Sequence, residues 1–139
     1  MIILDTNVLS EALRPDPSPA VLEWLAALHR TTAFTTTITQ AEILYGIESM
    51  PAGKWRTGLL AAADRIFGQE FSGRILPFDE DAARAYARIV SSRDAAGKPI
   101  SQFDAMIAAI AHAHEASVAT RNTSDFQGCG IVLVNPWKD

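Results

Sequence analysis

Four carboxylates in this chain have the type and spacing for metal-dependent chemistry: Asp5, Glu42, Asp104 and Asp125. Carboxylates that gather at one place repel one another unless a cation lies among them. Their oxygen ligands favour Mg²⁺ or Mn²⁺, since the sequence has no His/Cys cluster with zinc spacing. Such a site suits in-line hydrolysis of a phosphodiester, in which one or two metal ions activate a water and stabilise the leaving oxygen.

Glu42 and Asp104 also have an ordinary structural explanation. They follow Thr39 and Ser101, respectively, by three residues, so each could be the acidic half of a capping box at a helix start. Both, however, share a predicted helix face with apolar residues. A carboxylate that faces inward on an apolar stripe is costly unless it is paired or metal-bound, and both interpretations remain open at this point.

Asp5 and Asp125 stand at the ends of predicted strands or just after them. Asp5 ends a buried apolar run that has no structural need of an acid, although an Asx turn into the next helix would explain it. Asp125 lies in a polar stretch, where it could be a turn or cap residue. Close by, Thr120 could position water or phosphate, and Arg121 is a candidate phosphate contact.

Strands that alternate with helices must position these side chains. The apolar, β-branched run over residues 1–4 predicts a buried central strand. Further strands are predicted over residues 33–36, 74–78, 118–120 and 131–134, and helices over 8–13, 19–28, 39–50, 53–67, 80–96 and 102–113. The pattern predicts an α/β fold, a three-layer α/β/α sandwich with a mainly parallel central sheet. Right-handed crossovers then bring strand ends and helix starts to the rim that carries Asp5.

Composition narrows the class of protein. A length of 139 residues predicts a single domain over 1–139, and 48% apolar and 20% charged residues are ordinary for a soluble globular chain. The single cysteine, Cys129, excludes an internal disulfide and fits the reducing cytoplasm. We expect neither a signal peptide nor a membrane span. A net charge of −4 argues against a broad electrostatic footprint for nucleic acid, so an RNA substrate would be held locally.

Four segments, taken in order and spacing, resemble the PIN-domain ribonucleases, and most closely the VapC-type, FitB-like toxins of bacterial toxin–antitoxin pairs. They are residues 3–11 (ILDTNVLSE), 38–46 (ITQAEILYG), 100–109 (ISQFDAMIAA) and 118–126 (VATRNTSDF), closed by 135–137 (NPW). The resemblance covers essentially the whole chain. It implies a Mg²⁺- or Mn²⁺-dependent endoribonuclease that forms a homodimer. It also implies neutralisation by a small VapB- or FitA-like antitoxin, through which alone operator DNA is bound.

The resemblance also assigns roles to residues. Asp5, Glu42 and Asp104 would bind the metal and carry catalysis, with Thr6 or Asn7 supporting Asp5 beside the substrate. In some relatives the fourth acid directly follows a Thr-Arg pair, where this chain has Asn122. In others it comes three residues later, at Asp125. The amide of Asn122 still offers a carbonyl oxygen, so both are candidates for the fourth position.

Other functions fit the sequence less well. An aspartyl phosphatase of the haloacid dehalogenase type needs a second Asp two residues after the first, where this chain has Asn7. A phosphoacceptor receiver domain needs paired acids and a lysine that do not accompany Asp5 in the expected order. The remaining alternative is a catalytically weak or inactive PIN-fold module that acts mainly as the dimeric half of a DNA-binding toxin–antitoxin complex.

Overall fold

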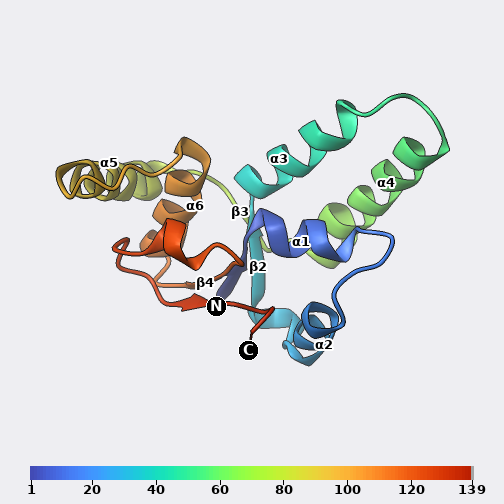
Figure 1. Cartoon of the computed structure of the whole chain (residues 1–139), viewed down its shortest axis with the longest axis horizontal. Helices are drawn as coiled ribbons and strands as arrows, with labels where there is room; N and C mark the ends of the chain where they lie inside the picture. Colours follow the sequence, from blue (N-terminus) through green and yellow to red (C-terminus); the bar gives the residue numbers. More distant parts are fainter. Residues whose placement is uncertain (139) are drawn as a thin grey trace.

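A five-stranded parallel sheet forms the centre of the computed structural model, which describes residues 1–138 (Figure 1). Every pair of neighbouring strands is parallel, in the order β3-β2-β1-β4-β5. The strands are β1 (Ile2–Leu4), β2 (Ala33–Thr36), β3 (Ile75–Leu76), β4 (Ser117–Ala119) and β5 (Leu133–Val134). The two strands beside β1 therefore come from distant parts of the chain.

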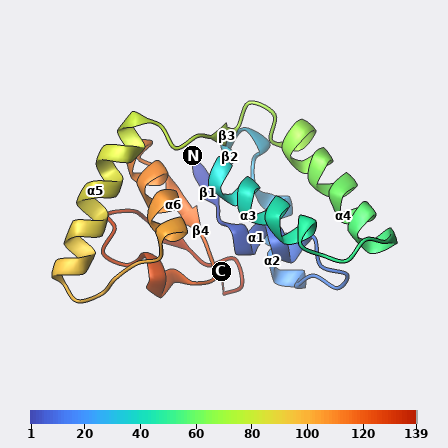
Figure 2. The same cartoon turned by 90° about the horizontal axis from the view of Figure 1, so that it is seen from above.

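Within residues 1–138, six helices cover the two faces of the sheet. They are α1 (Thr6–Ala12), α2 (Pro19–Ala27), α3 (Thr37–Glu48), α4 (Lys54–Arg65), α5 (Glu80–Ala95) and α6 (Gln102–Ala113). Figures 1 and 2 show α5 and α6 together on one side of the sheet and α1 to α4 on the other. Short helical turns follow α2, α4 and β4, at Arg30–Thr32, Ile66–Glu70 and Thr123–Phe126.

Two apolar cores of the described residues, one on each face, explain why most strand residues are apolar. Successive side chains of β1 point to opposite faces, so Ile3 packs with α5 and α6 while Leu4 packs with α1 to α4. In β4, Val118 and Ala119 divide between the two cores in the same way. The predicted α/β/α sandwich with a parallel sheet is therefore confirmed, although β3 and β5 are shorter than expected and β4 begins one residue earlier.

The start of α3 differs from the prediction in a way that concerns the site. The helix begins at Thr37, and its N-cap is Thr36, whose hydroxyl accepts from the Thr39 amide over 3.1 Å. Thr39, predicted as the cap, therefore lies inside the helix and Glu42 is its sixth residue. Thr36 takes the cap because it ends β2 in extended backbone, as an N-cap residue must. Glu42 is consequently too far along the helix for a capping box.

None of the helices within residues 1–138 has the length and apolar character needed to span a membrane. The expectation of a single domain over residues 1–139 stays a prediction, and residue 139 lies outside the described part of the chain.

The cap at Thr36 generates a stability prediction. Thr36→Val should lower the free energy of unfolding by about 1 kcal/mol, because the buried Thr39 amide loses its acceptor. Urea unfolding measures this change. Thr37→Val is the matched control, because within residues 1–138 the Thr37 hydroxyl makes no hydrogen bond. Equal losses in the two variants would contradict the cap assignment.

Candidate functional site

Asp5 lies at the carboxyl end of β1 and is also the N-cap of α1. Its side chain is only 4% exposed. Its Oδ1 accepts a hydrogen bond from the Thr6 amide and its Oδ2 accepts one from the Thr120 hydroxyl, both over 2.8 Å. Asp5 therefore caps α1 through the amide of the next residue, and not through the amide two residues on that the Asx turn considered above would use. This cap accounts for only one of the two oxygens. The second oxygen is held from β4, the neighbouring strand.

Thr120, directly after β4, organises one side of the site. Its side chain is fully buried, and its hydroxyl donates to Asp5 while it accepts from Asn7 Nδ2 over 3.2 Å and from the Asn122 amide over 3.1 Å. The single proton and both lone pairs of the hydroxyl are thus used. Asn7 Oδ1 in turn accepts from the Arg121 amide over 3.2 Å. Thr120 and Asn7 therefore position Asp5 and the loop that follows β4, and a contact of either with substrate stays a prediction.

Thr6 joins two of the candidate acids. Its amide donates to Asp5, and its hydroxyl donates to Glu42 Oε1 over 2.8 Å. The hydroxyl oxygen of Thr39 is 3.1 Å from that of Thr6 and buttresses it from α3. One residue thus fixes Asp5 with its backbone and Glu42 with its side chain. This explains why a small β-branched hydroxyl residue stands between Asp5 and Asn7.

Asp104 approaches the site from the first turn of α6. Ser101 caps this helix as predicted, accepting from the Asp104 amide over 3.2 Å. The pKa of the half-buried Asp104 carboxyl is raised, mainly by burial, and a hydrogen bond to the Ser101 side chain partly offsets the rise. The charge of Asp125 raises this pKa too, whereas Arg93 lowers it. The cap thus uses the backbone amide of Asp104, while its carboxylate interacts with charges on other segments.

The electrostatics of Asp5 show that two other acids act on it. The pKa of Asp5 is raised from 3.8 to about 6, and burial is the main cause. Hydrogen bonds from Thr120 and Thr6 lower it, while the charges of Asp104 and Glu42 raise it. The fold thus brings three acids separated widely in sequence close enough to repel.

Asn122 and Asp125, the two candidates for the fourth position, are both exposed. The Asn122 backbone amide donates to the Thr120 hydroxyl, whereas the Asn122 side chain makes no hydrogen bond to another residue within 1–138. Asp125 lies in the helical turn Thr123–Phe126, and its charge reaches Asp104. The choice between them stays open. The effect of the Asp125 charge on the pKa of Asp104 favours Asp125.

Arg93 is a supporting residue that the sequence analysis missed. It lies on α5, is only 8% exposed, and donates to the carbonyl oxygens of Lys98, Asp125 and Gln127 over 2.6, 2.9 and 2.9 Å. It therefore fastens the turn that carries Asp125 and brings positive charge toward Asp104. Nothing in the local pattern of α5, which carries other arginines at helical spacing, distinguishes it.

The donor set fits a hydrated Mg²⁺ ion. Within residues 1–138 no three His, Cys, Asp or Glu side chains converge tightly enough to form a ready-made metal site. Mg²⁺, however, usually keeps several waters and is held by one or two carboxylates together with substrate phosphates. The repulsion that Glu42 and Asp104 exert on Asp5 is of the kind that such an ion relieves. These three carboxylates are therefore the residues that could hold it.

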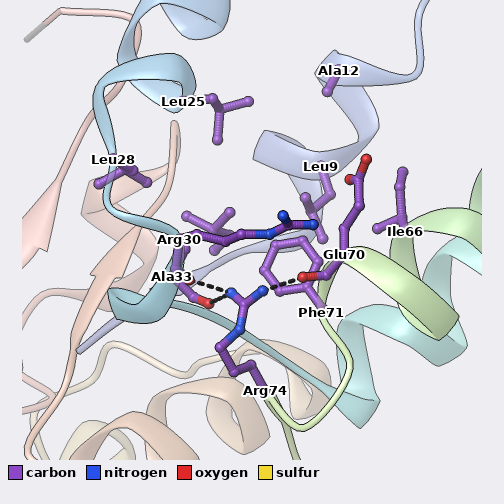
Figure 3. Close-up of a pocket in the computed structure, with 11 residues that line it drawn as sticks. Leu9, Ala12, Leu25, Leu28, Arg30, Ala33, Ile66, Glu70, Phe71 and Arg74 are labelled. Atoms are coloured by element: carbon purple, nitrogen blue, oxygen red, sulfur yellow. Dashed lines mark hydrogen bonds between the residues drawn. The ribbon is translucent and has the colours of Figure 1, made fainter.

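A separate, mainly apolar cavity of about 340 Å³ lies between α1, α2 and the Ile66–Glu70 turn (Figure 3). Leu9, Leu25 and Phe71 line it, and the Arg74 guanidinium at its edge donates to backbone carbonyls, including those of Ala33 and Glu70. None of the four candidate acids lines this cavity. It is therefore distinct from the acidic site.

Comparisons with known proteins agree with this geometry. A family model described as the PIN domain matches residues 2–127. A VapC ribonuclease of Sinorhizobium fredii is 44% identical over 141 residues, which cover 99% of each chain. The toxin FitB of Neisseria gonorrhoeae is 42% identical over 139 residues and 100% of each chain. In a solved structure of FitAB bound to a DNA fragment, one chain is 42% identical and matches with a TM-score of 0.93, over 99% of this chain and 96% of that chain.

The buried acid generates a pH prediction. In the folded protein Asp5 keeps its proton up to about pH 6, whereas the unfolded chain releases it near 3.8, so this group destabilises the fold as pH rises between those values. The free energy of unfolding falls by about 3 kcal/mol at most over this range. We expect Asp5→Asn to remove this pH-dependent fall, because asparagine does not ionise. Urea unfolding of both proteins from pH 3.5 to 7.5 in EDTA measures the difference, and a difference that does not change with pH would contradict the raised pKa.

Proposed function

This chain belongs to the PIN-domain family, as a toxin of the VapC and FitB type, and we propose that it is a Mg²⁺- or Mn²⁺-dependent endoribonuclease. The observation that carries the proposal is the buried Asp5 carboxylate. Thr6 links it to Glu42 by hydrogen bonds, and the charge of Asp104 raises its pKa. An arrangement that keeps three repelling acids together costs stability. The presence of these acids at one place therefore supports a bound cation and the phosphodiester hydrolysis that such a cation promotes.

In this proposal Asp5, Glu42 and Asp104 hold the ion, and Asp125 or Asn122 completes the site. A bound Mg²⁺ would supply an activated water and offset negative charge on the leaving oxygen. With a pKa of about 6, Asp5 is mostly ionised at neutral pH and ready to bind the ion. The Thr6 hydroxyl keeps one Glu42 oxygen oriented, so that ordering this side chain costs less on binding.

Partners follow from the relatives. The FitAB complex solved on DNA supports an antitoxin of the VapB or FitA kind that neutralises this chain and connects it to operator DNA. We further propose that the chain is a homodimer and acts on RNA in the cytoplasm, where the free thiol of Cys129 stays reduced.

The test of the proposed activity is cleavage of end-labelled mixed tRNA by the antitoxin-free protein. We expect discrete fragments with Mg²⁺ or Mn²⁺ and none with EDTA. Asp5→Asn should lower kcat/KM by about a hundredfold or more, because a metal ligand is lost. Asp64→Asn, which removes an exposed acid on α4, is the matched control and should cleave like the wild type.

Equal cleavage by the wild type and by Asp5→Asn would reject the catalytic assignment. If folded, metal-loaded wild-type protein cleaves no RNA, the alternative of a binding module within a DNA-bound complex is favoured instead.

The fourth site residue can be assigned by comparing Asp125→Asn with Asn122→Ala. We expect Asp125→Asn to raise the Mg²⁺ concentration for half-maximal cleavage by about three- to tenfold, because it removes a charge that acts on Asp104. Asn122→Ala keeps the backbone amide that bonds to Thr120 and should change this concentration little. The opposite order would assign the position to Asn122.

A further inference from the structure

Arg121, on the loop directly after β4, stacks on an aromatic ring from the far end of the chain. Its guanidinium carbon lies 5.1 Å from the centroid of the Trp137 ring, within the range of a cation–π interaction. Arg121 is itself exposed, and Trp137 is half-buried. The ring therefore limits the directions in which this exposed cation can point.

The Trp137 ring is held in place by the sheet and by a turn. Val134 of β5 pairs with Ala119 of β4, and its carbonyl accepts from the Thr120 amide over 2.9 Å. The chain then turns, with the Trp137 amide donating to Asn135 Oδ1 over 3.0 Å. The indole also packs against the core on the side of α1 to α4. It is thus a fixed platform beside the end of β4.

The backbone of Arg121 is fixed relative to Asp5 as well. Its amide donates to Asn7 Oδ1, and Asn7 Nδ2 donates to the Thr120 hydroxyl, which donates to Asp5. A short chain of hydrogen bonds therefore runs from the arginine backbone to the buried acid. The backbone of Arg121 is consequently held beside the proposed metal site, while the Trp137 ring limits where its guanidinium can lie.

Charge shows why such a cation is needed. The protein carries a net charge of −4, and the acids of the site repel an incoming phosphodiester. Within residues 1–138 the ion pairs use Arg14, Arg56 and Arg84, so Arg121 is not committed to a carboxylate there. An uncommitted arginine beside the acids is suited to bind a phosphate oxygen.

We propose that Trp137 is a positioning residue that holds the Arg121 guanidinium ready for an RNA phosphate next to the scissile bond. The proposal rests on the endoribonuclease function proposed above. A loop arginine loses rotamer freedom when it binds, and stacking that already restricts it reduces this loss. Trp137 therefore contributes to RNA affinity through Arg121, without touching the reacting atoms.

The experiment is a double-mutant cycle of Trp137→Leu and Arg121→Ala, with two readouts. Steady-state cleavage with Mg²⁺ separates KM from kcat, and fluorescence anisotropy of labelled RNA in EDTA measures binding without cleavage. Trp137→Leu should weaken binding and raise KM by about two- to fivefold with little change in kcat. Arg121→Ala should do so by about tenfold and reduce the slope of log K against log salt by about 0.7.

The decisive result is the double variant. If Trp137 acts through Arg121, Trp137→Leu has no further effect on binding once Arg121 is alanine. If Trp137 only packs, its effect is the same in both backgrounds and the proposal is wrong. Trp137→Phe, which keeps an aromatic face, should restore most of the affinity lost in Trp137→Leu.

Two controls distinguish a positioning role of Trp137 from a general loss of core packing and from failure of the proposed activity. Trp24→Leu removes another tryptophan from the same core and should leave RNA binding unchanged, while thermal unfolding shows whether each variant is folded. Absence of cleavage by the wild type would reject the proposed activity, but the binding cycle would still test the role of Trp137. Wild-type RNA affinity in both single variants would overturn the proposal.

Discussion

The burial of one carboxylate, Asp5, is the constraint on which the rest of the site depends. A buried acid must be given hydrogen bonds to each oxygen, and the chain supplies them from the helix that follows β1 and from the end of β4. These bonds only partly offset the cost of burial and of the neighbouring acids, since the pKa of Asp5 remains raised. Thr6, Asn7 and Thr120 are best understood as the support that this single charge requires.

The parallel sheet explains how residues far apart in sequence reach Asp5. Because β1 lies between β2 and β4, the segments that follow those two strands come to the same rim. Glu42 arrives on α3, directly after β2, and Thr120 arrives directly after β4. The crossover through α6 brings Asp104 to the rim at its first turn. The order of the strands therefore selects which side chains meet.

Sequence reasoning succeeded where local pattern decides structure. The apolar run before Asp5, the cap at Ser101 and the spacing of apolar residues predicted the sheet and the helix starts. It failed at α3, because Thr36 and Thr39 can both cap and only the position of β2 decides between them. It also missed Arg93 and the contact between Arg121 and Trp137, since in each case the partners come from segments that no local pattern connects.

The hydrogen bond between Asp5 and Thr120 spans 115 residues, and this separation orders events during synthesis. The central strand β1 is synthesised before its neighbour β4, which follows only after β2, β3 and all six described helices. At a synthesis rate of ~5–20 residues per second, roughly ten seconds pass between the synthesis of β1 and that of β4. Until then Asp5 lacks one of its two supports and the sheet lacks one side. The acidic site is therefore assembled only after β4 has been synthesised, and a nascent chain that stops before β4 does not yet carry it.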